Sequence, residues 1–216
     1  MTLKFAHKTT QSKTILNGQL VIQTNGNTKQ KTKRKILLAK DKIKIKRTIE
    51  YNGPNKRDYF LVDLFKKLQP TVGCEVGVRN GRTTFKLLES FPNLKMFAID
   101  FDIKLFYKDS VILKYGPRLK AIQGHSHEVH NQVEDGSLDF VFIDASHDYS
   151  SVKGDIEYYT PKLKPNGWLC GHDMDFPGVN QAVNELLPND HHIGPNNVWF
   201  KCLDNSVPIP FKVLDI

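Results

Sequence analysis

The sequence is poor in cysteine and has no long apolar run, and both absences narrow what the protein can be. Cys74, Cys170 and Cys202 stand far apart in apolar stretches without metal-site spacing, so we expect reduced core residues in a reducing, cytoplasmic compartment. A membrane helix needs a run of about 18 apolar residues, and the sequence contains none. The first residues also lack the continuous apolar stretch of a secretory signal. With 39% hydrophobic and 25% charged residues among 216, the composition favours one sizeable globular domain.

Positive charge is concentrated at the start of the chain. The first 50 residues contain 13 of the 31 lysines and arginines, against only Asp41 and Glu50, whereas the remaining 18 basic residues face 21 acidic ones. Such a basic arm can hold an anionic partner such as nucleic acid. The arm has few aromatic residues for stacking on bases, so we favour a solubilising extension over specific RNA recognition.

Turn signals within the first 53 residues predict a small β element. Asn17-Gly18 and Asn25-Gly26 separate short β-like runs, as in a hairpin. Residues 43–47 alternate like a strand with one wet face. Asn52-Gly53-Pro54 then breaks the chain. We therefore expect a basic extension over 1–53 and the main domain over 54–216.

Beyond this break, short apolar strands alternate with helices. Apolar runs are found at 72–78, 94–100, 119–124, 138–144, 168–173, 198–203 and 207–214, and amphipathic segments lie between them, the first at 57–68. Nearly continuous apolar strands that alternate with helices are typical of a parallel sheet covered on both faces. We predict a doubly wound, Rossmann-like α/β domain, in which ligands bind beyond the carboxyl ends of the strands.

The end of the first strand of this domain indicates a nucleoside cofactor. Glu75, Gly77 and Gly81 form an E-x-G-x-x-x-G loop before a helix, and such glycines let the backbone approach a ligand closely. A purely structural tight turn would also explain them, and the spacing is not that of the three-glycine dinucleotide motif. Asp100 ends the second strand, where a carboxylate can accept hydrogen bonds from ribose hydroxyls. Asp102 is its rival for that role.

The next strand ends carry further polar groups. Gly124, His125 and Ser126 follow the third strand, where a backbone amide and a hydroxyl could meet an adenine, although a glycine at this place can be a simple turn. Asp144 closes the fourth strand, and Asp148 is a candidate N-cap of the next helix. His147, three residues after Asp144, can take a proton near neutral pH.

His172 and Asp173 close the fifth strand. If the fourth and fifth strands are neighbours, they lie about 4.8 Å apart, and Asp144 and Asp173 could share one divalent cation. Oxygen-rich ligation favours Mg²⁺ or Mn²⁺, and a histidine ligand such as His172 shifts the preference toward Mn²⁺ or Fe²⁺. The competing interpretation is that these aspartates only cap helices or occupy loops.

These strand-end residues carry a resemblance. The chain from about 56 to 216 resembles a class I S-adenosylmethionine-dependent methyltransferase. The stretch 140–183, with its D-A-S-H-D-Y and G-H-D segments, is similar to the family that includes macrocin-type sugar O-methyltransferases and CmcI-like proteins. The resemblance does not cover residues 1–50.

The resemblance implies a seven-stranded sheet with a reversed last strand. It implies that the glycine loop with Glu75 surrounds the methionine end of the cofactor and that Asp100 holds its ribose. It also implies that Asp144 is a Mg²⁺ ligand and His147 a catalytic histidine. His172 and Asp173 stand where the metal-dependent members carry a Glu-Asp pair, and His125 stands where related sequences often have an acidic residue near the adenine.

The expected function is therefore S-adenosylmethionine-dependent O-methylation of a sugar hydroxyl or another small-molecule hydroxyl, assisted by Mg²⁺ or Mn²⁺. The cation would lower the pKa of the acceptor hydroxyl, and His147 would take its proton. Three alternatives stay open: a metal-independent methyltransferase acting on nitrogen or nucleic acid, a nicotinamide-dependent oxidoreductase, and a non-catalytic binding module. The missing third glycine argues against the second alternative, and the intact Asp144, His147 and Asp173 argue against the third. We expect no membrane association, and the sequence leaves the acceptor and a homo-oligomeric state open.

Overall fold

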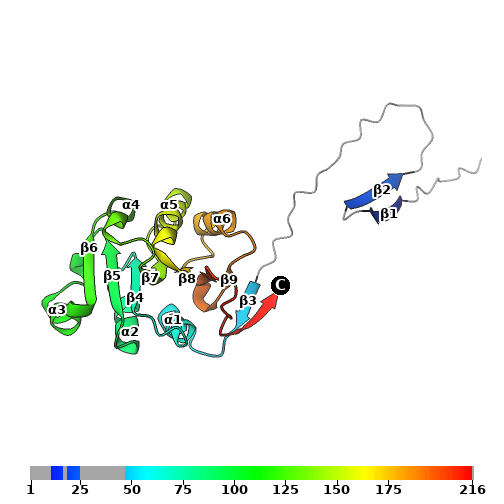
Figure 1. Ribbon diagram of the computed structural model, residues 1–216. Coiled ribbons are helices and arrows are strands. Elements are labelled where there is room, and N and C mark those ends of the chain that lie inside the picture. Colours follow the sequence, from blue (N-terminus) through cyan, green and yellow to red (C-terminus); the bar gives the residue numbers. More distant parts are fainter. Residues whose placement is uncertain (1–10, 17–18, 25–46, 216) are drawn as a thin grey trace, which may run out of the picture. The chain divides into compact units, whose positions relative to one another are not determined.

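The computed structural model describes residues 11–16, 19–24 and 47–215. The chain divides into two compact units, residues 1–42 and residues 43–216. In the first unit, β1 (Gln11–Leu16) and β2 (Gln19–Thr24) pair antiparallel, with Leu16 opposite Gln19 (Figure 1). This pairing agrees with the small β element predicted for the extension, whereas the turns predicted at Asn17-Gly18 and Asn25-Gly26 and the start of the strand predicted over 43–47 lie outside the described residues.

The second unit is built on one mixed sheet with helices on both faces. Its strands are β3 (Arg47–Glu50), β4 (Val72–Val76), β5 (Lys95–Asp100), β6 (Leu119–Gln123), β7 (Leu138–Ile143), β8 (Leu163–Gly171), β9 (His192–Ile193), β10 (Trp199–Cys202) and β11 (Lys212–Asp215). The helices are α1 (Arg57–Phe65), α2 (Arg82–Ser90), α3 (Asp109–Tyr115), α4 (Ser126–Val129), α5 (Tyr149–Tyr159) and α6 (Pro177–Leu186). Across the sheet the strand order is β11-β3-β9-β10-β8-β7-β4-β5-β6 (Figure 1). The predicted doubly wound α/β architecture is confirmed.

The sheet has more strands than expected. Among the described residues it contains nine strands, not seven, because β3 and β11 extend it beyond β9. The five neighbouring strands β6, β5, β4, β7 and β8 are all parallel. Strand β10 runs antiparallel to both β8 and β9. A reversed strand is thus present, and β11 at the edge is also antiparallel to its neighbour β3.

The strand β3 also bears on the expected domain boundary. It precedes the Asn52-Gly53-Pro54 break, yet it pairs in parallel with β9 and antiparallel with β11, where Ile49 faces Val213. The sheet therefore begins before residue 53, and the compact unit begins at residue 43. The sequence of β3 is short and half polar, so it gave no strong strand signal. Its partners β9 and β11 lie far away in the sequence, so the local pattern could not reveal its pairing.

Alternation along the strands divides the core between the two faces. Phe140 and Phe142 of β7 pack into the cluster that includes the buried residues of α1 and α2. Val141 and Ile143, on the opposite side of the same strand, pack into the cluster that includes α5 and α6. Successive side chains of a strand point to opposite faces, so a strand covered by helices on both sides must be apolar throughout. This is the pattern from which the fold was predicted.

Backbone hydrogen bonds continue past the carboxyl ends of the central strands. The N–H groups of Gly77, Gly124, Asp144 and His172 each donate to the last or next-to-last carbonyl of a neighbouring strand, over 2.8–3.0 Å. These four residues are the first to follow β4, β6, β7 and β8. The polar groups predicted to bind ligands are thus held along one edge of the sheet. In the part of the chain that the structure describes, no helix has the length and apolar character needed to span a membrane.

Two truncations test the role of β3. Removing residues 1–42 should leave a cooperative thermal transition close to that of the full chain, because the sheet keeps all nine strands. Removing residues 1–50 deletes β3 and leaves β11 without its neighbour. We expect that second variant to melt roughly 5–10 °C lower, since a loss of 1 kcal/mol shifts the midpoint of a domain this size by about 2–4 °C. Calorimetry would measure the melting of both variants. If the variant without residues 1–42 already fails to melt cooperatively, the basic arm is part of the core.

Candidate active site

A cleft of about 810 Å³ opens along the carboxyl ends of β4, β5, β6 and β7. Its volume is that of a typical cofactor or small-molecule site. The lining includes five of the residues predicted to bind the cofactor, namely Gly77, Asp100, Gly124, His125 and Ser126. It also includes Asp144, so the cleft reaches the end of β7. Glu75 and Gly81 do not line it.

Asp100 braces the glycine loop. One carboxylate oxygen, Oδ2, accepts hydrogen bonds from the backbone N–H groups of Val78 and Arg79 over 2.9 and 2.7 Å, and Oδ1 accepts one from Asp102 over 3.0 Å. The residue is 8% exposed. Because each carboxylate oxygen can accept two hydrogen bonds, Oδ1 keeps an acceptor position for a ligand in the cleft. Asp102 instead caps the short 3₁₀ turn Ile103–Leu105 through the backbone N–H of Lys104.

Gly77 is required by a close approach of two backbone segments. Its φ is +86°, a conformation that residues with a side chain rarely adopt. A Cβ at this position would lie 2.3 Å from the carbonyl oxygen of Asp144. The loop after β4 therefore packs directly on the chain that leaves β7. Gly81, with φ +80°, starts α2 behind this loop.

Glu75 is a buried acid behind the cleft. It is almost completely inaccessible and accepts a hydrogen bond from the Thr84 hydroxyl. Burial raises its pKa to about 8, and the nearby Asp144 carboxylate adds to the rise, while the Thr84 bond and the Arg57 guanidinium oppose it. Its carboxyl is therefore mostly uncharged at neutral pH. The side chain lies behind the glycine loop, where it is bonded to Thr84 of α2 and does not line the cleft.

Three residues beyond β7 and β8 form the centre of the site. Ligand-type atoms of Asp144, His147 and Asp173 all lie within 4.8 Å of one another. The Nε2 atom of His147 is 2.6 Å from Oδ2 of Asp173, and its ring stacks on Phe176 with centroids 4.4 Å apart. Asp148 caps α5, with Oδ1 accepting a hydrogen bond from the backbone N–H of Ser151 over 3.0 Å. That cap was expected, and it leaves Asp148 outside the cluster.

His172 lies beside the two carboxylates but outside this group of three, and its predicted role as a metal ligand stays a prediction. Its Nδ1 is 2.8 Å from Oδ1 of Asp173 and 3.4 Å from Oδ1 of Asp144, at ion-pair distance but not aligned as a hydrogen bond. Burial lowers the pKa of His172, but the two neighbouring carboxylates outweigh burial and the net pKa is raised. In this arrangement His147, not His172, stands as the third ligand-type group beside Asp144 and Asp173.

Asp173 adopts a conformation that is uncommon for a residue with a side chain. Its φ is +58°, in the left-handed region. Such a residue costs of order 1–3 kcal/mol and is found most often where function requires it. The backbone around it is held, because its carbonyl accepts a hydrogen bond from the N–H of Phe176, and Met174 donates to the carbonyl of Asn197. In this backbone conformation the Asp173 carboxylate faces His147 and His172.

Three polar residues of the site were missing from the sequence prediction. Arg57, the first residue of α1, places its guanidinium 3.0 Å from Oδ2 of Asp144. Asp155 of α5 is buried in the wall of the cleft, with His127 Nε2 3.2 Å from its Oδ1. Burial raises the pKa of Asp155, and His127 opposes the rise. Neither helix position carries a sequence signal of its own, since only the packing of α1 and α5 against the sheet brings these groups to the strand ends.

Tyr149 and Lys153 have the Tyr-x-x-x-Lys spacing found in some nicotinamide-dependent oxidoreductases. Lys153 Nζ lies 3.4 Å from the Tyr149 hydroxyl, but both side chains bind Glu185 of α6, over 2.8 and 2.6 Å. Neither residue lines the cleft. The pair joins two helices and gives no support to an oxidoreductase.

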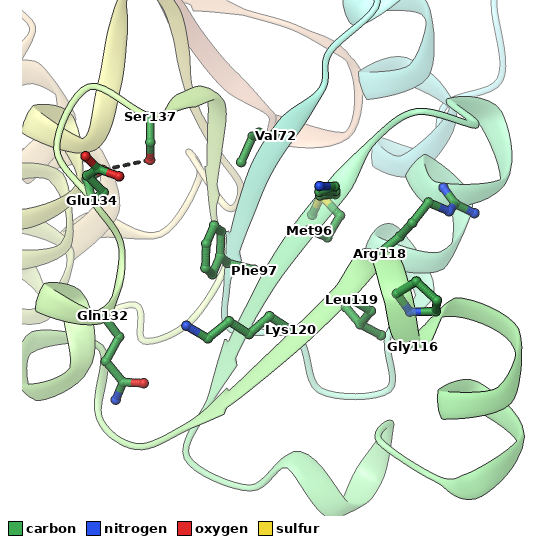
Figure 2. A pocket seen from close by; sticks show the side chains of 12 residues that line it. Val72, Met96, Phe97, Gly116, Arg118, Leu119, Lys120, Gln132, Glu134 and Ser137 are labelled. Atoms are coloured by element: carbon green, nitrogen blue, oxygen red, sulfur yellow. Dashed lines mark hydrogen bonds between the residues drawn. The ribbon is translucent and has the colours of Figure 1, made fainter.

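A second hollow, of about 450 Å³, lies at the opposite edge of the sheet. It is lined by the first residues of β4, β5 and β6, and Figure 2 shows Lys120 and Phe97 among its lining side chains. The Lys120 Nζ is 5.4 Å from the centroid of the Phe97 ring. None of the predicted site residues contributes to this hollow.

Comparison with known proteins agrees with this geometry. Residues 74–174 match the family described as "Methyltransferase domain". No curated protein matches the chain by sequence. A candidate caffeoyl-CoA O-methyltransferase from Staphylococcus aureus is similar, with a TM-score of 0.58 at 16% identity, covering 70% of this chain and 84% of that one.

Two further solved structures are similar. The O-methyltransferase TomG from Streptomyces achromogenes, in complex with SAM, has a TM-score of 0.55 at 12% identity over 72% of this chain and 82% of its own. An O-methyltransferase from Bacillus cereus, in complex with SAH, has a TM-score of 0.55 at 16% identity over 70% and 82%. At such low identity these likenesses show the fold, which is the Rossmann-like fold of class I methyltransferases. The narrower likeness to macrocin-type enzymes stays a prediction.

Replacing Glu75 with glutamine tests the buried acid. A carboxyl whose pKa is raised from 4.5 to about 8 in the folded chain stabilises the fold fully below pH 4.5 and loses that contribution as the pH rises through 8. Glu75→Gln does not titrate, so the variant should gain stability relative to the natural chain between about pH 4.5 and pH 8, by up to about 1.4 kcal/mol for each pH unit, with no further gain above pH 8. Urea unfolding at pH 5, 7 and 9 would measure this. The exposed Glu157→Gln is the control, and parallel pH profiles for Glu75→Gln and the natural chain would contradict the assignment.

Proposed function

We propose that the protein is an S-adenosylmethionine-dependent O-methyltransferase that acts on a hydroxyl group of a small molecule, with a sugar diol as the favoured acceptor. One observation carries the proposal: a single cleft is lined by Gly77, Asp100 and Gly124 and continues to Asp144, which belongs to the cluster of ionisable groups. A nucleoside cofactor and a reacting hydroxyl need such adjoining sites. The methyltransferase match over 74–174 and the shared fold of TomG, which binds SAM, support the choice of cofactor.

The cofactor would lie along the strand ends. The free acceptor position of Asp100 suits a ribose hydroxyl, and the loop at Gly77 lets the methionine part approach the backbone. The adenine would lie by Gly124, His125 and Ser126, with the His127–Asp155 pair in the same wall. Glu75 and Gly81 do not line the cleft. They would shape the part of the site that holds the methionine end of the cofactor from behind.

The cluster fits a divalent cation by its donor set. Two carboxylates and one imidazole lie within 4.8 Å of one another, and such oxygen-rich sites take Mg²⁺ or Mn²⁺. We assign the cation to Asp144 and Asp173, with the imidazole of His172 beside them. When bound there, a cation lowers the pKa of an acceptor hydroxyl.

His147 would accept the proton of that hydroxyl. Its Nε2 faces Asp173, which leaves Nδ1 as the atom that receives the proton. Asp173 and the stacked ring of Phe176 fix the imidazole in orientation. Transfer of the methyl group is an in-line displacement on carbon, so the remaining task of the chain is to hold the acceptor oxygen in line with the sulfur–methyl bond.

A second candidate is metal-independent methyl transfer. The observation that favours it is the Arg57 guanidinium, which lies 3.0 Å from Oδ2 of Asp144. A cation of the protein itself thus neutralises the carboxylate that would hold the metal. The basic arm, the feature that would suit a nucleic-acid acceptor, lies largely outside the described residues.

Replacing Asp100 with alanine should weaken binding of S-adenosylhomocysteine, the product that S-adenosylmethionine leaves after methyl transfer. We expect Asp100→Ala to cost about 1.5–3 kcal/mol of S-adenosylhomocysteine affinity, the scale of a hydrogen bond to a charged group, with further loss from the unbraced glycine loop. Titration calorimetry measures this directly. Asp102→Ala is the matched variant, and it should lose much less. Unchanged affinity in Asp100→Ala together with a loss in Asp102→Ala would reverse the two assignments.

Replacing His147 with alanine should affect chemistry more than binding. We expect turnover on sugar acceptors to fall about 10²- to 10⁴-fold, the usual contribution of a general base, with S-adenosylhomocysteine and Mn²⁺ affinities retained. The loss should shrink at high pH, where hydroxide can take the proton. Near-normal turnover with about 1 kcal/mol lower stability would show that His147 only helps to start α5. Loss of Mn²⁺ binding would make His147 a ligand.

A further inference from the structure

The carboxylate of Asp144 already has a cation beside it. The Arg57 guanidinium lies 3.0 Å from Oδ2, and the two side chains are 31% and 9% exposed. The Nε atom of Arg57 is also 3.4 Å from the Thr83 hydroxyl on α2. The guanidinium is therefore held between the start of α2 and the end of β7, at the centre of the proposed cation site.

Every carboxylate oxygen of the cluster faces a nitrogen atom. Both Oδ1 atoms, of Asp144 and Asp173, face Nδ1 of His172, and Oδ2 of Asp173 faces Nε2 of His147. Oδ2 of Asp144 faces Arg57. The two carboxylates are thus satisfied by the protein's own groups, and a carboxylate as buried as Asp144 would be strongly destabilising without such a partner.

Arg57 differs from the two histidines in how it can make room for a metal. A histidine can give up a proton and remain in place as a neutral group or a ligand. A guanidinium stays charged at every relevant pH, so at 3.0 Å from Oδ2 it opposes a divalent cation that binds this oxygen at about 2.1 Å. A cation ligated through Oδ2 therefore has to displace the guanidinium, whose length and partial exposure give it a path toward solvent.

We propose that Arg57 is an exchangeable counter-ion of the cation site: it neutralises Asp144 when no metal is bound, and a divalent cation binds by displacing its guanidinium. The inference rests on the proposed metal-assisted function and names the residue that sets its metal affinity. Two consequences follow. The chain folds without metal, because Asp144 is never left unpaired, and its metal affinity is lower than its donor set alone would give.

Arg82 supplies a matched control. It carries the same charge, begins α2 next to Thr83, and pairs with Asp58 through two contacts of 3.1 and 3.2 Å. Neither Arg82 nor Asp58 belongs to the cluster. Removing Arg82 therefore removes one nearby positive charge and one ion pair without opening Asp144.

Titration of the full chain with Mn²⁺ alone tests the inference. Arg57→Gln should bind Mn²⁺ roughly 5- to 50-fold more tightly than the natural chain, the range that the loss of one partly buried competing ion pair spans. Arg82→Gln should stay within about twofold, because Arg82 pairs with Asp58 and not with a carboxylate of the cluster. Without metal, Arg57→Gln should melt at a lower temperature than the natural chain, and saturating Mn²⁺ should remove most of that difference.

Unchanged or weaker Mn²⁺ binding in Arg57→Gln overturns the inference, as does equal tightening in Arg82→Gln or the lack of a Mn²⁺ signal in all three proteins. If Arg57→Gln does not fold, Arg57→Lys gives the same test, since an ammonium cannot contact Asp144 and Thr83 with two separate nitrogens, and a smaller tightening is expected. S-adenosylhomocysteine titrated into the same samples keeps the two proposals apart. Binding of this compound without Mn²⁺ tightening refutes only the role of Arg57, whereas its failure to bind the natural chain refutes the proposed methyltransferase.

Discussion

Backbone hydrogen bonds between parallel strands fix the position of the strand-end groups in the candidate site. The ladder does not stop where the strands end, since the N–H groups of Gly77, Gly124, Asp144 and His172 continue it by one residue. Each side chain that follows a strand is therefore held by the sheet. Parallel strands place all these ends at one edge, which is why residues spread over about 80 positions of the sequence, from Val76 to Asp155, line one cleft.

Charge balance is the second constraint on the site. Burial raises the pKa of Glu75 to about 8, so this acid adds little negative charge near neutral pH. The two cluster carboxylates, Asp144 and Asp173, are balanced by Arg57 and by His172, whose pKa is raised. Both carboxylates thus face nitrogen atoms of the protein itself. In the proposed exchange, a cation that binds Asp144 through Oδ2 displaces the guanidinium of Arg57, the first residue of α1.

The outer strands show how the fold departs from a minimal methyltransferase sheet. β3 and β11 add two strands beyond β9, and β3 comes from the segment that the sequence assigned to the extension. Its residues join the sheet through pairing with β9 and β11, which are about 140 and 165 positions away. Local pattern cannot reveal such pairing, because a four-residue strand has too few side chains to show alternation.

The order of strands and helices, the doubly wound class and the ligand-bearing strand ends could all be predicted from the sequence, because apolar periodicity and glycine placement are local signals. The sequence also singled out Asp100, Asp144, His147 and Asp173. Only the tertiary structure decided how these groups pair. In the folded chain His172 faces the carboxylates, Glu75 lies behind the cleft, and Arg57 contacts Asp144. Ion pairing and burial depend on which helix packs over which strand end, and that information lies in contacts between residues far apart in the chain.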